Sequence, residues 1–141
     1  MIKTYRKTAT IKAERFDNSR EMAKKYHVEY DGAYILPFRI ETHNGWLGMK
    51  VGDWILTGVN DEYWPITNDV FSKTYAELPV IPKEVAYVIE EDNDDGDYKL
   101  GVAFYAAYEG ALQPSVVNWI LTHAEVFARA WLDGYVVEED K

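Results

Sequence analysis

The stretch VGDWILTGVNDEYWP, residues 51–65, predicts two strands joined by a tight turn. A glycine–aspartate pair near its start is typical of a turn, and an apolar run rich in strand-forming residues follows over 54–57. The next turn is expected near Asn60-Asp61, and the second strand over 63–66. Pro65 has no backbone N–H, so we expect this second strand at the edge of a sheet or close to its own end.

The sequence before this stretch continues the strand pattern. Residues 11–14 alternate apolar and charged side chains, which predicts a half-buried strand. Residues 34–36 form a short apolar run that predicts another strand. Within residues 39–49, the pair Asn44-Gly45 predicts a hairpin with a type I′ turn, in which both turn residues have a positive φ.

One short helix is expected among these strands. Asn18 and Ser19 can cap it, and it is predicted to run through His27. A single further helical turn, capped by Asp69, is expected after the last strand and carries Phe71 and Tyr75. The N-terminal half is therefore predicted to be a small antiparallel sheet with one short helix.

The C-terminal half has a helical period instead. Residues 100–108 and 124–132 each place apolar side chains at i, i+3, i+4, i+7 and i+8, which is one stripe along a helix. Thr122 with Glu125 predicts a capping box, and Gly134 predicts a helix end. We therefore predict an all-α half of three to four short helices, and an α+β fold for the chain.

Two prolines mark the boundary between the halves. Pro79 and Pro82 fix φ and remove backbone donors, which disfavours a helix or a central strand between them. We predict a β-rich segment over residues 1–78, a junction over 79–82 and an acidic helical segment over 83–141.

The formal net charge of −9 is carried entirely by the part of the chain after residue 78. Residues 1–78 contain 11 Lys/Arg and 11 Asp/Glu, whereas residues 79–141 contain 4 and 13. A negative surface repels nucleic acid and attracts a basic protein surface, so no direct nucleic-acid binding is expected. Excess acidity also keeps small proteins soluble, and this second interpretation stays open.

The densest acidic run has two interpretations. Its carboxylates are candidates for contacting basic residues of a partner: Glu90, Glu91, Asp92, Asp94, Asp95 and Asp97. A solvated connection between two helices explains the same composition. A calcium loop does not, because placing Gly96 at the sixth position of an EF-hand puts Val102 where the bidentate glutamate is needed.

The sequence carries no motif of a catalytic, phosphate-binding or metal site. His27, His43 and His123 lie far apart, without a second ligand at helical spacing, and no glycine-rich phosphate loop occurs. Turn and cap chemistry accounts for Asp53 and Asp69 without any catalysis. We therefore predict a protein that is not an enzyme and that uses no cofactor and no metal.

Aromatic residues suggest an alternative, a small-molecule site. The chain has five Trp and eleven Tyr. Four aromatic residues lie on neighbouring predicted strands: Trp46, Trp54, Tyr63 and Trp64. Rings on one face could stack on a nucleobase. The same rings could instead form the core of a small sheet, and both interpretations stay open.

Cysteine is absent, which excludes disulfides and thiolate metal sites. The polar start MIKTYRK, residues 1–7, leads into no apolar run, and no stretch approaches the ~18 apolar residues that a membrane helix needs. We expect a cytoplasmic protein that does not enter a membrane.

Two parts of the sequence resemble phage proteins. Residues 51–65, followed by Asp69, Phe71 and Tyr75, are similar to a β module common in small phage proteins, although Val51 stands where that module usually has proline. The ending FARAWLDGY, residues 127–135, resembles the C-terminal signature of a domain of unknown function from phages and prophages of low-GC Gram-positive bacteria. The resemblance implies a phage accessory protein. It carries over no catalytic or binding residue, because the matching positions are packing and turn residues.

These observations lead to one hypothesis about function and two alternatives. The hypothesis is a phage-encoded, non-enzymatic accessory protein that uses an acidic surface to bind a host or phage protein. Its expected setting is counter-defence, such as inhibition of a CRISPR or another defence system in the host cytoplasm. The first alternative is a sponge that sequesters a nucleotide-like immune signal in an aromatic pocket, with a homo-oligomer as one form. The second is a structural phage protein.

Overall fold

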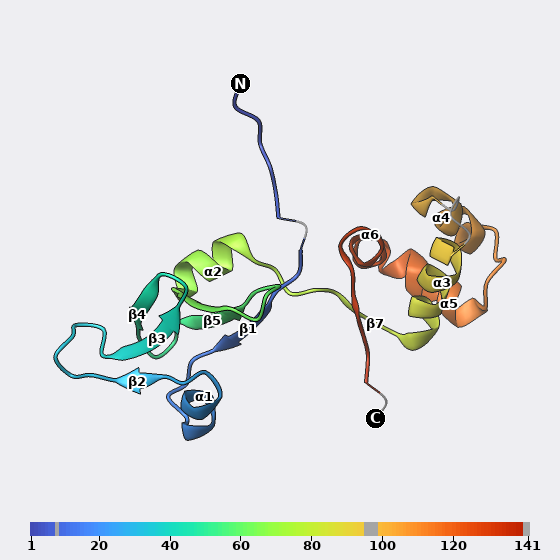
Figure 1. The fold of residues 1–141 in the computed structure, drawn as a ribbon. Helices are drawn as coiled ribbons and strands as arrows, with labels where there is room; N and C mark the ends of the chain where they lie inside the picture. Colours follow the sequence, from blue (N-terminus) through green and yellow to red (C-terminus); the bar gives the residue numbers. More distant parts are fainter. Residues whose placement is uncertain (8, 95–98, 140–141) are drawn as a thin grey trace. The chain divides into compact units, whose positions relative to one another are not determined.

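The chain divides into two units, residues 1–76 and 77–141, in a computed structural model that describes residues 1–7, 9–94 and 99–139 (Figure 1). The first unit contains antiparallel sheets, and the second contains most of the helical residues. The α+β fold class predicted from the sequence is therefore confirmed.

The strands of the first unit form two three-stranded antiparallel sheets in place of the single sheet predicted. The first sheet has the order β1-β5-β6, made of Lys12–Arg15, Trp54–Thr57 and Tyr63–Ile66. The second has the order β2-β3-β4, made of Glu29–Tyr30, Phe38–Thr42 and Gly45–Met49. β6 is an edge strand, as the missing N–H of Pro65 predicts.

The two sheets share one core with helix α1, Arg20–Lys25. Ile55 on the central strand β5 is fully buried, as are Ile40 and Met49 from the second sheet. Met22 and Tyr26 from the α1 segment close the same core. The Ser19 side chain caps α1 as predicted, since its hydroxyl accepts a hydrogen bond from the Met22 N–H at 3.2 Å.

A second helix, α2 (Asn68–Thr74), follows β6 and is longer than the single turn that was predicted. The predicted cap, Asp69, is wrong, because that residue already lies in the first turn. Thr67 has the extended backbone that a cap needs, and its hydroxyl accepts from the Val70 N–H at 3.4 Å.

Residues 34–36 form a loop, so the strand predicted there is wrong. The loop joins β2 to β3 and is closed by the Asp31 N–H, which donates to the Pro37 carbonyl at 2.8 Å. Leu36 lies against the backbone of β4 at Gly48, where an added Cβ would come within 2.7 Å of the Leu36 Cβ. The apolar side chain therefore covers a neighbouring strand instead of pairing in one of its own.

The hairpin of β3 and β4 is confirmed, but its turn is not type I′. Thr42 pairs with Gly45, and Gly45 has a φ of +96° whereas Asn44 does not have a positive φ. The Thr42 hydroxyl donates to the Gly45 carbonyl at 2.8 Å and accepts from the Asn44 N–H at 3.2 Å. The Thr42 side chain therefore closes the turn, in which Gly45 has a positive φ and Asn44 does not.

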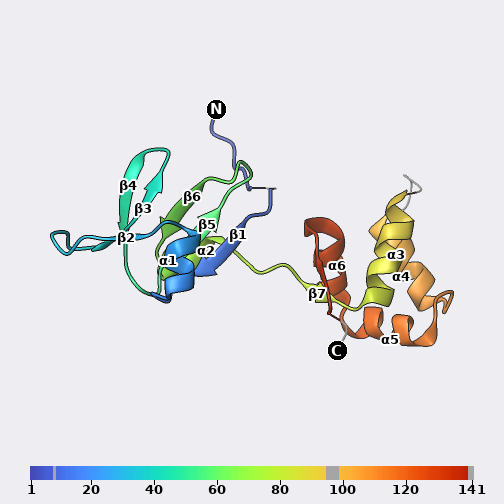
Figure 2. The ribbon, with the colours of Figure 1, turned by 60° about the horizontal axis from the view of Figure 1, so that its bottom comes forward.

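The helices of the second unit are α3 (Lys83–Asp94), α4 (Leu100–Tyr108), α5 (Pro114–Thr122) and α6 (Ala124–Asp133) (Figure 2). Their shared core is made of small and aliphatic side chains around one ring, Phe127. The fully or almost fully buried members are Ile81, Val85, Ala86, Ile89, Ala103, Ala107, Val116, Ile120, Phe127 and Ala130.

Helix α6 differs from its prediction in two respects, the exposure of Leu132 and the cap at its N-terminus. Phe127 and Ala130 are buried, whereas Leu132 is 68% exposed. The predicted capping box is wrong, because His123 occupies the cap position and makes no side-chain cap. The Thr122 hydroxyl donates instead to the Asn118 carbonyl of the preceding helix at 2.7 Å. Gly134 ends α6 with a φ of +99°, as predicted.

The second unit also contains two short strands, so it is not purely helical. β7 (Val80–Ile81) and β8 (Val136–Val137) pair in parallel. β7 lies inside the segment predicted to be a junction, and Ile81 is buried in the helical core. The prolines that flank β7 are compatible with a strand that is paired on only one side.

Truncating the Phe127 ring tests this core. We expect Phe127→Ala to lower the free energy of unfolding of the helical unit by about 3–5 kcal/mol, because it leaves a cavity among residues that are already small. Leu132→Ala, on the exposed side of the same helix, should change it by less than about 0.5 kcal/mol. Urea denaturation followed by helical circular dichroism measures both variants. Equal effects would contradict the assignment of Phe127 to the centre of the core.

Candidate functional site

The acidic residues gather in the second unit. Residues 77–141 contain 14 Asp/Glu and 4 Lys/Arg, whereas residues 1–76 contain 10 and 11. The Lys25–Glu14 and Lys73–Asp69 ion pairs both lie in the first unit. The first unit therefore has a formal charge of +1 and the second a formal charge of −10.

Many carboxylates of the second unit are free to meet a partner. From Lys83 onward, five exposed carboxylates among the described residues form no ion pair and no hydrogen bond: Glu84, Glu109, Glu125, Glu138 and Glu139. They belong to α3, to the end of α4, to α6 and to the segment after β8. The negative charge is therefore spread over several elements and is largely uncompensated.

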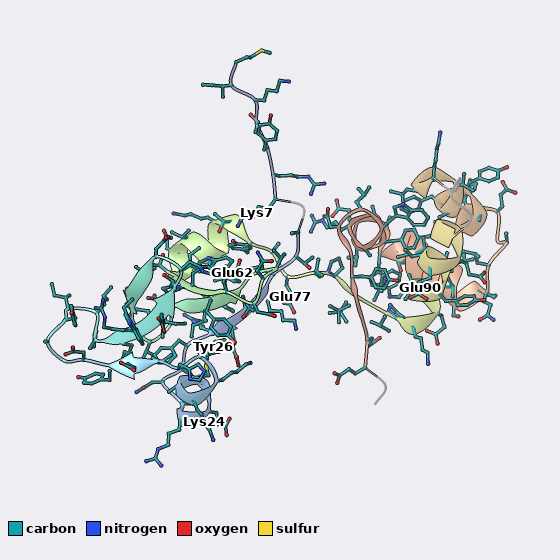
Figure 3. All side chains as sticks on the ribbon, viewed as in Figure 1. Lys7, Lys24, Tyr26, Glu62, Glu77 and Glu90 are labelled. Carbon is teal, nitrogen blue, oxygen red and sulfur yellow. The ribbon has the colours of Figure 1, made fainter. Side chains whose placement is uncertain are left out.

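The acidic run predicted to bind a partner is only partly within the described residues. Glu90 (Figure 3) and Glu91 are exposed in α3. The Tyr135 hydroxyl donates to Glu90 at 3.1 Å, and the Tyr87 hydroxyl donates to Glu91 at 2.6 Å. Asp92 and Asp94 belong to α3 by their backbone, and their side chains lie outside the description. Asp95 and Asp97 lie outside the described residues.

These two hydrogen bonds change the acidity of the tyrosines. Partial burial, followed by the bond to Glu90, raises the pKa of Tyr135 above its ordinary value of 10.0. The bond to Glu91 raises the pKa of Tyr87. Both phenols therefore stay protonated and donate hydrogen bonds to the two carboxylates of α3.

The four aromatic residues proposed as a ligand site do not form one cluster. Trp54 and Trp64 lie on the same face of the first sheet, because the register pairs Leu56 with Trp64 and Trp54 with Ile66. Tyr63 lies on the opposite face, where its ring meets the edge of Tyr26 at 5.0 Å. Trp46 belongs to β4 of the other sheet and is 41% exposed.

Trp54 is instead part of an aromatic stack with α2. Its ring lies parallel to Phe71 at 4.0 Å, and Phe71 continues to Tyr75 at 5.4 Å. The Trp54 indole N–H donates to the Asn68 side chain at 2.9 Å. The Lys7 ammonium lies 5.7 Å from the Trp64 ring and 5.8 Å from the Tyr75 ring. The sequence shows Phe71 and Tyr75 at helical spacing, but it does not reveal that their partner is Trp54.

The first unit has a shallow hollow that combines charged and aromatic side chains, with a volume of about 550 Å³. Of the four predicted aromatic residues, it contains only Tyr63. Glu14 lies in its wall and accepts hydrogen bonds from the Tyr26 hydroxyl at 2.7 Å and from the Lys25 ammonium at 2.9 Å. Both donors therefore lower the pKa of Glu14 below its ordinary value of 4.5, and the Tyr26 bond has the larger effect.

Three further carboxylates of the first unit have partners close to them in the sequence. Asp53 is 95% buried, and one of its oxygens accepts from the Lys50 N–H at 3.0 Å. Glu62 accepts from the Asn60 N–H at 2.9 Å, and Asp69 pairs with Lys73. In the part of the chain that the structure describes, no three His, Asp or Glu side chains are placed to hold a metal ion.

Comparison with known proteins gives a match to the C-terminal part of the chain. Residues 76–141 match a family described as a protein of unknown function, DUF1642. The C-terminal half is thus similar to a domain of unknown function, as the sequence predicts. No curated protein and no solved structure matches the chain. None of the helices in the described ranges has the length and apolar character that a membrane crossing requires.

Replacing Tyr26 tests the arrangement around Glu14. A carboxylate with a lowered pKa stabilises the fold above pH 4.5, and this contribution is lost as the pH falls through the folded-state pKa. We expect Tyr26→Phe to move the pKa of Glu14 back toward 4.5 and to weaken the acid dependence of stability. Tyr63→Phe keeps the Glu14 bonds and is the matched control. Side-chain NMR titration measures both, and an unchanged Glu14 titration in Tyr26→Phe would show that this hydrogen bond is not formed.

Proposed function

We propose that this chain is a non-enzymatic accessory protein whose helical unit binds a basic surface of another protein. The observation that carries the proposal is the separation of charge between the units, with exposed and unpaired carboxylates on the acidic one. The local partners of Asp53, Glu62 and Asp69 also support a role other than catalysis, because each of these carboxylates is engaged by a residue close to it in the sequence.

Charge of one sign on a small surface favours association in a particular way. It attracts an oppositely charged partner over about a Debye length, ~10 Å at 0.1 M salt, and raises the rate of encounter. Exposed single ion pairs contribute little each, so the effect depends on the number of carboxylates that face the partner. The second unit offers exposed carboxylates on several of its elements for such contacts.

The biological setting of the proposal is counter-defence in a phage or prophage. Its support is the resemblance of residues 51–65 and 127–135 to small phage proteins. A protein that blocks a nucleic-acid-binding defence component gains from an acidic surface, since such components carry basic surfaces for their own substrates. The target is therefore proposed to be a host or phage protein with a basic face.

The nucleotide sponge has weaker support. Trp54 and Trp64 share a sheet face, but Trp54 already stacks on Phe71, and Tyr63 and Trp46 lie elsewhere. A pocket that needs all four rings has no common wall in this arrangement. A structural phage protein would use the acidic surface for assembly, and it differs from the main proposal only in its partner.

Charge reversal tests the proposal. We expect the triple variant Glu84→Lys, Glu109→Lys, Glu125→Lys to bind its partner at least about ten-fold more weakly, because it removes unpaired charge from the acidic unit. The partner is first obtained by affinity capture from phage-infected host lysate and identified by mass spectrometry. Its affinity is then measured by calorimetry between about 50 and 500 mM salt, and the wild-type affinity should fall as salt rises.

A matched control separates position from net charge. Glu21→Lys, Glu29→Lys, Glu41→Lys makes the same charge change at exposed residues of the first unit. We expect it to change the affinity by less than about three-fold, since exposed charges away from the interface are screened. Equal losses in the two triple variants, or an affinity that does not depend on salt, would refute the electrostatic proposal.

A further inference from the structure

The β7–β8 ribbon is held to the second unit by one buried and one hydrogen-bonded side chain. Ile81 is fully buried in the helical core. Tyr135, directly before β8, packs against the same core and donates its hydroxyl to Glu90 of α3. Val80 and Val136 pair on the other face of the ribbon and are 51% and 50% exposed. The ribbon is thus fixed on one side and open on the other.

The hydrogen bonds of the ribbon show which backbone groups point away from it. The Val136 N–H donates to the Pro79 carbonyl at 2.9 Å, and the Glu138 N–H donates to the Ile81 carbonyl at 2.8 Å. Backbone groups alternate in direction along a strand, so the N–H and C=O of Val137 point to the outer edge of β8. No strand of the described residues pairs with that edge.

The outer edge of β7 is protected, whereas the edge of β8 is not. Val80 lies between Pro79 and Ile81-Pro82, so the prolines leave few backbone donors on that side. Proline next to an edge strand is a common means of preventing further pairing. β8 has no proline and is made of two β-branched residues, Val136 and Val137. A strand added to this ribbon would therefore add to β8.

The negative charge beside β8 favours an added strand that carries basic side chains. Glu138 and Glu139 follow the strand directly and are exposed without an ion pair among the described residues. Pairing of two β8 edges from two copies would add the negative charges of both copies to one small ribbon, which opposes self-association. A segment with Lys or Arg at these positions would instead gain charge-assisted contacts.

We propose that the outer edge of β8 accepts an extended, basic segment of a partner protein as an added strand. Main-chain hydrogen bonds to Val137 give the pairing, and the basic side chains of the segment lie beside Glu138 and Glu139. The partner's charge rests on the proposed function above, whereas the strand pairing rests on the open edge. The two parts can therefore fail separately.

Synthetic peptides and the full-length chain test the strand pairing. The probe is an acetylated and amidated Lys-Val-Lys-Val-Lys peptide, compared with the same peptide N-methylated at every backbone amide and with Glu-Val-Glu-Val-Glu. Affinity is measured by fluorescence anisotropy at low salt, and hydrogen exchange of the Val137 amide by NMR. We expect the lysine peptide to bind with protection of that amide, and N-methylation to weaken binding at least about ten-fold.

A pair of proline variants localises the effect on the chain. Val137→Pro removes the outward N–H and keeps the bonds that the Val136 and Glu138 N–H groups donate to the other strand, so we expect about ten-fold weaker binding with an unchanged melting temperature. Val136→Pro removes an inward N–H, so we expect a lower melting temperature. Because the N-methylated peptide tests the same pairing on unaltered protein, a folding defect in either variant does not affect that comparison.

The outcomes separate the two proposals. Binding of the lysine peptide that persists after N-methylation and in Val137→Pro would overturn the strand pairing and leave the acidic surface as the binding determinant. Equal binding of the lysine and glutamate peptides would overturn the basic partner. If N-methylation weakens both peptides in that case, the edge of β8 still pairs with a strand, but without selection for charge.

Discussion

Packing of the Phe127 ring among alanine and aliphatic side chains is the contact on which the helical unit depends. Phe104 meets this ring edge-on at 5.3 Å, and Trp131 lies 6.1 Å from it. Alanines on α4 and α6 let the helices come close, so one ring fills the space that larger side chains would otherwise share. A core this small leaves most positions of short helices exposed. Those positions carry the carboxylates, so the small interior leaves room for a large charged exterior, and the sequence fills it mainly with acidic residues.

The first unit is also small, and its two sheets share one core. Ile55 on β5 faces Ile40 and Met49 from the other sheet, so one face of the first sheet is committed to the interior. The opposite face is left for Trp54 and Trp64, and α2 covers part of it by stacking Phe71 on Trp54. Because side chains alternate between the two faces of a strand, the aromatic residues of the first sheet lie on opposite faces. Their number in the sequence reflects several small packing contacts instead of one pocket.

Patterns with a strong period could be predicted from the sequence. The helices over 100–108 and 124–132 follow from apolar residues that recur every three to four positions, and the strands over 54–57 and 63–66 follow from strand-forming runs bounded by turn residues. Their caps were less predictable, because several residues compete for each role. Thr122 satisfies its hydroxyl on α5 and so cannot cap α6.

Contacts between distant residues could not be predicted in the same way. β7 and β8 are two residues long, and neither has a local pattern that reveals its partner more than fifty residues away. The same holds for Leu36, whose contact with Gly48 keeps an apolar segment in a loop. Of the candidate site, the charge separation was visible in the sequence, but the open edge of β8 required the register of the ribbon.

The parallel pairing of Val80–Ile81 with Val136–Val137 also has a consequence for the order in which the chain folds during translation. Every strand pair of the first unit lies within residues 12–66, so these sheets can form while the helical unit is still being synthesised. The ribbon cannot close until Val137 has left the ribosome exit tunnel. Until then β7 is unpaired. Its flanking prolines lack backbone N–H donors, which reduces incorrect pairing of β7 with other strands of the nascent chain.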